Sequence, residues 1–251
     1  MKYAGIDIGS RTIELIILES DSIIEKYQTN TGFDPVRAAS QLLDGLQYDC
    51  IMATGYGREI FQLNYESQTV TEIKAYARGV KELFPNAQTI LDIGGQDSKA
   101  ISLLNNGKIK KFEMNDRCAA GTGKFLEVMA NALGFDIDQF GDEALKASKD
   151  LKINSMCTVF AESEVTSLIA KGQNRYEIAR GLHASVVRRA VSMLKRISIS
   201  GEIVFAGGVA NNSCIRHLLS EALNHKIKVP DDPQFVGAFG AALLAASIEV
   251  P

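Results

Sequence analysis

Residues 5–12 read GIDIGSRT, and residues 13–18 continue as IELIIL. Both apolar runs have β-strand character, and the Gly9-Ser10 pair between them is a turn signal, so the segment predicts a β-hairpin. Asp7 stands at the end of the first strand, directly before this turn. The hairpin indicates the fold class because the chain repeats it.

The second copy reads LDIGGQDS at residues 91–98 and KAISLL at residues 99–104. It again places an acidic residue, Asp92, at the end of a strand and before a turn of small residues. A third glycine turn follows an apolar strand in residues 203–209, IVFAGGV. Helical patterns lie between these strands, and such alternation predicts an α/β fold.

Five segments carry helical patterns: residues 67–84, 123–133, 161–170, 176–197 and 236–246. We expect two lobes, residues 1–85 and 86–251, with the boundary near Pro85. The small residues around Gly237 and Gly240 predict close helix packing rather than a flexible linker.

The composition is that of an ordinary soluble protein: 251 residues, 46% hydrophobic and 23% charged, with a net charge of −3. A chain of this kind buries a large core, so disorder is excluded. The mild acidity argues against nucleic acid as a main partner. No secretory signal and no apolar run of about 20 residues is present, and the four cysteines are too few for a disulfide framework. We therefore expect a cytoplasmic protein that does not enter a membrane.

The repeated turns are suited to binding phosphate. Glycine lets the backbone approach a ligand closely, and the exposed N–H groups of a turn can hold phosphate oxygens. Asp7 and Asp92 are expected to hold Mg²⁺ or its water shell, since Mg²⁺ prefers oxygen ligands. Two such hairpins facing each other would hold a nucleotide, and the third turn, with Gly207 and Gly208, could accept its adenosine or its α-phosphate side. Ordinary tight turns remain the alternative.

Two cysteines, Cys118 and Cys157, precede predicted helices. A helix N-terminus favours anions and lowers the pKa of a thiol, which suits a thiolate ligand. An iron–sulfur cluster needs four cysteines, so two chains related by a two-fold axis are required to share one. From spacing alone, buried thiols are the simpler interpretation, as they are for Cys50 and Cys214.

The three turns, in this order, resemble the phosphate-1, phosphate-2 and adenosine motifs of the superfamily of actin, sugar kinases and heat-shock chaperone ATPases. Residues 114–126, MNDRCAAGTGKFL, and 157–165, CTVFAESEV, resemble the activator component of 2-hydroxyacyl-CoA dehydratases. The same family, BadF/BadG/BcrA/BcrD, contains the ATPase subunits of benzoyl-CoA reductase. Residues 54–58, TGYGR, and 92–97, DIGGQD, fit this family too.

The resemblance implies two duplicated ribonuclease-H-like lobes with ATP in the cleft between them. It also implies a homodimer in which Cys118 and Cys157 of both chains hold one [4Fe-4S] cluster. The activity expected is an ATP-dependent one-electron reductase coupled to ATP hydrolysis. The acceptor is a partner enzyme, such as a 2-hydroxyacyl-CoA dehydratase or a related double-cubane cluster enzyme, and the donor is a ferredoxin or flavodoxin.

The expected catalytic residues are Asp7 and Asp92 for Mg²⁺ and Gln96 for the attacking water. The residues expected to line ATP or ADP are Gly9, Ser10, Arg11, Thr12, Ile13, Glu14, Gly94, Gly95, Gln96, Asp97, Gly207, Gly208 and Gln234. Glu14 departs from the resembled family, in which relatives commonly carry Lys at this position. Glu162 and Glu164 belong to the second cysteine motif, but no role for them follows from the sequence.

Two alternatives remain. A small-molecule kinase of the same superfamily fits the duplicated turns but leaves the cysteine motifs unexplained. An interaction module switched by ATP, without a cluster, requires slow hydrolysis and no iron.

Overall fold

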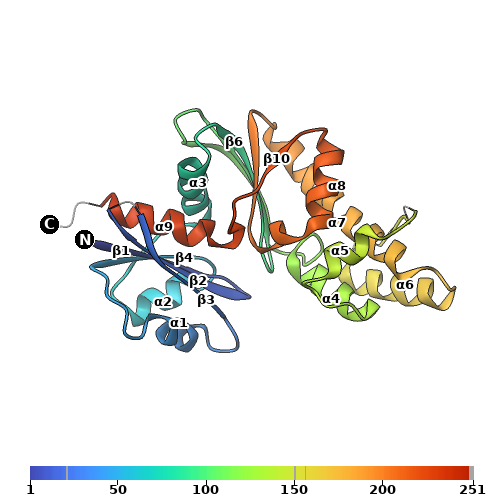
Figure 1. Ribbon diagram of the computed structural model, residues 1–251, viewed down its shortest axis with the longest axis horizontal. Helices are drawn as coiled ribbons and strands as arrows, with labels where there is room; N and C mark the ends of the chain where they lie inside the picture. The colour runs from blue at the N-terminus through green and yellow to red at the C-terminus, as the bar shows by residue number, and fades with distance from the viewer. Residues whose placement is uncertain (21, 150, 156, 249–251) are drawn as a thin grey trace.

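The computed structural model describes residues 1–20, 22–149, 151–155 and 157–248, and contains two five-stranded sheets (Figure 1). The first sheet has the strand order β3-β2-β1-β4-β5, with bounds Ser22–Asn30, Thr12–Glu19, Lys2–Ile8, Cys50–Thr54 and Gln68–Thr69. The second, written in the same direction, has the order β8-β7-β6-β9-β10, with bounds Ile109–Asn115, Ser98–Leu103, Ala87–Ile93, Glu202–Ala206 and Ile227–Lys228.

The two sheets share one topology. β1 pairs antiparallel with β2 and parallel with β4, and β6 pairs in the same way with β7 and β9. The register places Asp7 opposite Glu14 in the first hairpin and Asp92 opposite Lys99 in the second. The predicted α/β class and the predicted duplication are therefore confirmed.

The inner strands are buried at most positions because both faces of each sheet are covered. β2 is buried at six consecutive positions and β7 at all six of its positions, whereas the outer strands β3 and β8 are largely exposed. The second half carries a larger helical layer than the first, at the far end of the molecule from the N-terminus (Figure 1).

Nine α-helices are described. Their bounds are α1 Pro35–Leu43, α2 Arg58–Asn64, α3 Glu72–Leu83, α4 Gly123–Leu133, α5 Phe140–Leu145, α6 Thr158–Ala170, α7 Arg175–Ile197, α8 Ser213–Leu223 and α9 Val236–Ala246. Two 3₁₀ turns, η1 Gly208–Asn211 and η2 Pro233–Phe235, complete the fold. α3 begins later than predicted because residues 68–69 form β5. In the described part of the chain, no helix combines the length and the apolar character needed to cross a bilayer.

The last helix of each half crosses to the other half. α3 follows the first sheet yet contacts β6 and β7, while α9 follows the second sheet and packs on β1, β2 and β4. In Figure 1, α9 lies along the first sheet, between it and the rest of the molecule. α9 packs on the first sheet although it lies within residues 86–251, so division of the chain at residue 85 remains a proposal. Residues 249–251 lie outside the described residues.

Glycines make this crossing possible. A Cβ on Gly240 of α9 would overlap the carbonyl oxygen of Ala75 in α3, and a Cβ on Gly5 of β1 would overlap the carbonyl oxygen of Ala238. The close helix packing predicted around Gly240 is therefore present. At these glycines, backbone meets backbone between α3, α9 and β1.

The first prediction concerns this contact. We expect Gly240→Ala to destabilise the protein by about 3 kcal/mol, because the new methyl group meets backbone that cannot rotate away. Urea unfolding measures the effect. Gly208→Ala, where a Cβ meets no atom within 4 Å, is the control, with an expected change within about 0.5 kcal/mol. Equal stabilities for the two variants would contradict the packing argument.

Candidate functional site

Two buried carboxylates end the central strands of the two sheets. Asp7 and Asp92 are 6% and 1% exposed. Each packs against a glycine at the end of the neighbouring parallel strand, Gly55 with φ 90° and Gly207 with φ 81°, where a Cβ would overlap a carboxylate oxygen. Only glycine adopts these φ values without strain and leaves room for the carboxylate. The duplication thus extends to the surroundings of each aspartate.

The turns after the two aspartates are closed by the same hydrogen bond. The N–H of Gly9 donates to the carbonyl oxygen of Thr12, and the N–H of Gly94 donates to that of Asp97, both at 3.0 Å. The intervening turn residues lie at the surface or half-buried. None of the hydrogen bonds found among the described residues uses the N–H groups of residues 10, 11, 95 and 96. These N–H groups are therefore available to a ligand.

The two turns lie against each other. A Cβ on Gly95 would be 3.1 Å from Ser10 Oγ. The carbonyl oxygens of Gly94 and Gly95 accept the N–H groups of Gly123 and Lys124, at 2.9 and 2.8 Å. These are the first residues of α4, so the second turn contacts the first turn on one side and holds the start of α4 on the other.

One ammonium group is buried among three carboxylates beside the second turn. Lys99 Nζ lies 2.5 Å from Glu72 Oε2, 2.6 Å from Asp97 Oδ2 and 3.3 Å from Asp92 Oδ2. Burial alone would lower the pKa of Lys99, but Asp92, Glu72 and Asp97 outweigh it and raise the pKa. Lys99 therefore stays charged and ties α3, which carries Glu72, to the second hairpin.

The two aspartates have excess negative charge around them. Burial raises the pKa of Asp92 to about 6 although Lys99 opposes the shift, and Asp92 Oδ1 has no hydrogen-bond partner among the described residues. Burial, followed by the charges of Glu72 and Glu14, raises the pKa of Asp7 well above its usual value. Groups held in this way favour a cation that lowers both pKa values.

Glu14 occupies the position in the first hairpin that Lys99 occupies in the second. Glu14 is 4% exposed, and burial raises its pKa to about 7 against the hydrogen bonds of Thr12 and Gln28. Gln28 Nε2 donates to Glu14 Oε1 at 3.2 Å. None of the ion pairs among the described residues involves Glu14, so the first hairpin has a carboxylate pair where the second has an ion pair.

The structure places the other predicted residues of the first turn in different surroundings. Ser10 and Thr12 are half-buried in the turn. The side chain of Arg11 points to α4 and forms an ion pair with Glu127. Ile13 is fully buried in the core of the first lobe, so only its backbone is available to a ligand.

The predicted residues of the second and third turns differ in their surroundings. Gln96 is exposed at the tip of the second turn. Gly207 donates its N–H to the carbonyl oxygen of Pro233 at 2.9 Å, and Gln234 Oε1 accepts from Asn211 Nδ2 at 3.1 Å. The third turn and Gln234 therefore form one local unit, whose Gly207 also touches Asp92.

Two of the four cysteines are exposed, and they are the two that the motifs selected. Cys118 lies between β8 and α4, and Cys157 is the N-cap residue of α6, a helix that packs on α4. Both thiols thus lie ahead of helix N-termini, as predicted. Cys214 is buried, as expected for a packing residue, and Cys50 is half-buried.

Sequence reasoning missed Glu72 and Lys99. The carboxylate oxygens of Glu72, Asp92 and Asp97 lie within 4.8 Å of one another. Lys99 had a signal in the repeat, because it stands in the second copy where Glu14 stands in the first. Glu72 had none, since only the crossing of α3 brings it to the second hairpin.

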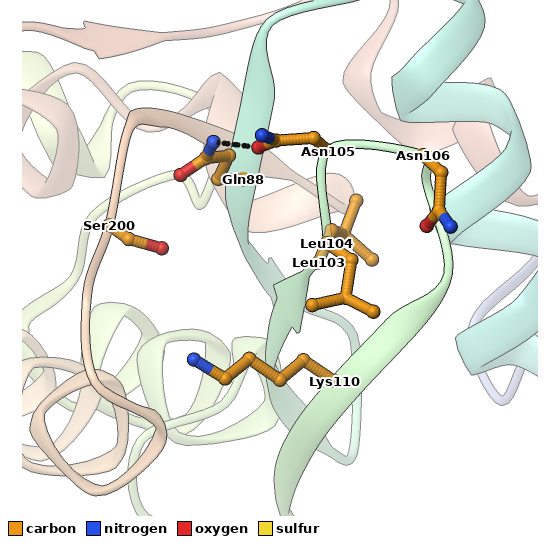
Figure 2. A pocket seen from close by; sticks show the side chains of 7 residues that line it. All are labelled: Gln88, Leu103, Leu104, Asn105, Asn106, Lys110 and Ser200. Atoms are coloured by element: carbon orange, nitrogen blue, oxygen red, sulfur yellow. Dashed lines mark hydrogen bonds between the residues drawn. The ribbon is translucent and has the colours of Figure 1, made fainter.

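A surface hollow of about 510 Å³ lies away from the two aspartates. Figure 2 shows that it is lined by side chains such as Lys110 and Ser200, and that Gln88 and Asn105 are hydrogen-bonded across its rim. Gln88 is near the start of β6, whereas Asp92 is near its end. The hollow therefore opens at the opposite edge of the second sheet from the duplicated turns.

The paired sheets, the crossing helices and the duplicated aspartate turns define the actin-like ATPase and sugar kinase fold. A glucokinase of the ROK family from Streptomyces griseus shares this fold, with a TM-score of 0.61 at 12% identity over 99% of this chain and 100% of that one. The family is narrower. Residues 4–245 match the BadF/BadG/BcrA/BcrD ATPase family, and the chain belongs to it.

Proteins of similar sequence align with almost the whole length of this chain. The 2-hydroxyisocaproyl-CoA dehydratase activator of Clostridioides difficile is 39% identical over 98% of this chain and 95% of its own. The activator of lactoyl-CoA dehydratase of Anaerotignum propionicum is 42% identical over 98% and 97%. The crystal structure of (R)-2-hydroxyglutaryl-CoA dehydratase component A from Acidaminococcus fermentans superposes with a TM-score of 0.91, at 38% identity over 98% of this chain and 97% of that one. The resemblance read from the cysteine motifs is confirmed.

The second prediction concerns Glu14. A buried acid with a raised pKa binds its proton more tightly in the folded state, so stability falls as the pH rises from 4.5 through about 7. Glu14→Gln keeps the shape and removes the ionisation. We expect the variant to gain stability over wild type as the pH rises from about 5 to about 8, by up to about 3 kcal/mol.

Urea unfolding of both proteins at the two pH values measures this gain. Glu19→Gln, at the exposed end of the same strand, is the matched control and should show no such trend. A stability difference between Glu14→Gln and wild type that does not change with pH contradicts the assignment of Glu14 as the titrating group.

Proposed function

We propose that this chain is an ATP-dependent activator that delivers a low-potential electron to a partner enzyme such as a 2-hydroxyacyl-CoA dehydratase or a related double-cubane cluster enzyme. One observation carries the proposal: the turn after Asp92 holds the first residues of α4 by two backbone hydrogen bonds, and Cys118 lies just before α4. The candidate nucleotide site and a candidate cluster ligand thus belong to one continuous unit.

Mg²⁺ and the phosphates of ATP fit the duplicated turns. Asp7 and Asp92 are buried carboxylates, and Asp92 Oδ1 has no hydrogen-bond partner among the described residues, which suits Mg²⁺ with its water shell. In this proposal the N–H groups of residues 10–12 and 95–97 would bind the phosphates, and the third turn would bind the nucleoside. Gln96, exposed at the tip of the second turn, is placed to orient the attacking water. The Clostridioides difficile relative was solved with bound ADPNP.

The exposed thiols fit half of an iron–sulfur site. One chain supplies Cys118 and Cys157, and a cluster takes four cysteines, so a second copy must supply the rest. Exposed apolar side chains beside the cysteines, Val159 and Phe160 on α6 and Met114 on β8, are suited to burial in such a homodimer. When bound, a [4Fe-4S] cluster would supply one electron at low potential.

ATP can act on the cysteines only by favouring one arrangement of the two lobes over another. Closure of the two turns around Mg-ATP changes how the second turn holds α4, and the backbone of residues 118–123 moves with it. The affinity of this chain for its partner enzyme, and the exposure of Cys118 and Cys157, then differ between the ATP and ADP states. We assign the chain to the reducing cytoplasm, where its four free cysteines persist and a ferredoxin or flavodoxin can supply electrons.

No specific observation favours either alternative, the small-molecule kinase or the interaction module without a cluster. A kinase shares the fold, and the Streptomyces glucokinase supports nothing narrower. An interaction module without a cluster leaves two exposed cysteines at helix N-termini unexplained.

The third prediction tests the nucleotide site. We expect Asp7→Asn to lower Mg²⁺-dependent ATP hydrolysis about 100-fold, because the amide is a poorer Mg²⁺ ligand. Thermal stability should not fall, since the buried carboxylate is replaced by a neutral group of the same shape. Glu59→Gln, on the exposed face of α2, is the control. Unchanged hydrolysis in Asp7→Asn would remove Asp7 from the site.

The fourth prediction tests the cluster. Protein purified without oxygen should hold about four irons and four sulfides per dimer. Cys118→Ala and Cys157→Ala should each abolish this, and Cys50→Ala should not. Absence of iron in the wild type after anaerobic reconstitution would refute electron delivery, and a screen for phosphoryl transfer to small molecules would follow.

A further inference from the structure

Both candidate ligand cysteines lie on irregular backbone rather than inside a helix or a strand. Cys118 lies in the connection from β8 to α4, and Cys157 ends the connection from α5 to α6. Loop backbone is mobile unless specific contacts hold it. Two sulfur atoms per chain must nevertheless keep a fixed separation to ligate one cluster with a second copy. The side chains that hold these connections therefore decide whether the site is ready before iron arrives.

The connection before Cys157 is held by a carboxylate from the second turn of α6. Glu164 Oε2 accepts the N–H of Ser155 at 2.7 Å, and Glu164 Oε1 accepts the N–H of Asn154 at 3.1 Å. Burial opposes ionisation of Glu164, but these hydrogen bonds outweigh it and lower the pKa, so Glu164 is a carboxylate at neutral pH. Both carboxylate oxygens of Glu164 thus accept backbone N–H groups two and three residues before Cys157. Neither oxygen caps α6 itself.

The same connection is anchored to α7 from the other side. Arg188 Nη2 donates to the carbonyl oxygen of Ile153 at 3.1 Å. Ile153 is 2% exposed, and Gly181 of α7 lets the carbonyl of Leu151 approach where a Cβ would overlap it. Residues 151–153 are therefore fixed to the core, and Glu164 extends that fixed stretch to residue 155.

The connection before α4 is held by an amide from the end of β8. Asn115 Nδ2 donates to the carbonyl oxygens of Cys118 at 2.9 Å and Ala120 at 3.3 Å. One NH₂ group thus donates to two carbonyl oxygens and fixes the backbone of the connection at Cys118. Asn115 is half-buried, whereas Cys118 is exposed.

We propose that Glu164 and Asn115 are positioning residues for the two cysteines, Glu164 for Cys157 and Asn115 for Cys118. The proposal rests on the proposed cluster and deepens it. Each residue acts on backbone beside its own cysteine and touches neither sulfur. Together they set the separation of the two sulfur atoms before the cluster is built, as outer partners orient the ligands of a metal site.

Two isosteric variants separate the two roles. Glu164→Gln keeps the length but turns an NH₂ group toward backbone N–H groups, so one hydrogen bond is lost. Asn115→Asp keeps the shape but removes the donor and sets a carboxylate against two carbonyl oxygens. Glu162→Gln makes the same chemical change as the first variant on an exposed side chain two residues earlier in α6, and it is the matched control.

The first readout needs no cluster. The alkylation rates of Cys118 and Cys157 are measured separately, by peptide mass spectrometry, in metal-free protein. We expect Glu164→Gln to change the rate of Cys157 at least about threefold and to leave Cys118 unchanged, and Asn115→Asp to do the reverse. Glu162→Gln should match wild type at both. A general loss of structure would change both cysteines in each variant, and thermal unfolding checks for it. Such a result would overturn the proposal, as would unchanged rates.

The second readout uses reconstituted dimers. Iron release to a chelator should be about tenfold faster in Glu164→Gln and in Asn115→Asp than in wild type, and the midpoint potential should shift. If the wild type binds no iron, the proposed function fails whatever the alkylation pattern. If the wild type binds iron while both variants keep its release rate, potential and alkylation rates, the positioning roles fail and the cluster stands.

Discussion

The approach of α9 to β1 and α3 is the constraint on which the two-lobed arrangement depends. Because Gly5, Gly79 and Gly240 carry no side chains, backbone meets backbone where the last helix of each half crosses to the other. The crossing brings Glu72 of α3 to Lys99 of the second hairpin and sets Gly237 of α9 against the carboxylate of Asp7. The same contact that joins the lobes therefore also completes the surroundings of both buried aspartates.

The charges in this region follow from that geometry. Lys99 lies among the carboxylates of Glu72, Asp92 and Asp97, while Asp7 and Glu14 stand opposite each other in the first hairpin. Burial raises the pKa of Asp7, Glu14 and Asp92. Buried charges of one sign are costly, and natural proteins keep them mainly where a ligand or a metal compensates. The two buried aspartates therefore favour a bound cation. The turn after Asp92 is hydrogen-bonded to the first residues of α4.

The sequence predicted much of this fold because the repeat is local. Alternating apolar runs, a glycine turn and an acidic strand end are read within 14 residues, and their recurrence predicts two equal sheets. The cysteine motifs were likewise visible, and the exposure of Cys118 and Cys157 against the burial of Cys214 agrees with the motifs. Boundaries were less well predicted: β5 replaces the expected start of α3 because two residues pair with β4.

What the sequence by itself determined is the set of local elements: two aspartate hairpins, a third glycine turn and two cysteines ahead of helices. Hydrogen bonding and apolar periodicity along the chain specify such elements without reference to distant residues. Only the tertiary structure decided that α9 packs on the first sheet and that Glu72 meets Lys99. It also decided that Glu164 holds the backbone before Cys157. These contacts join residues whose separation along the chain carries no pattern, and packing, ion pairing and hydrogen bonding in the folded chain select them.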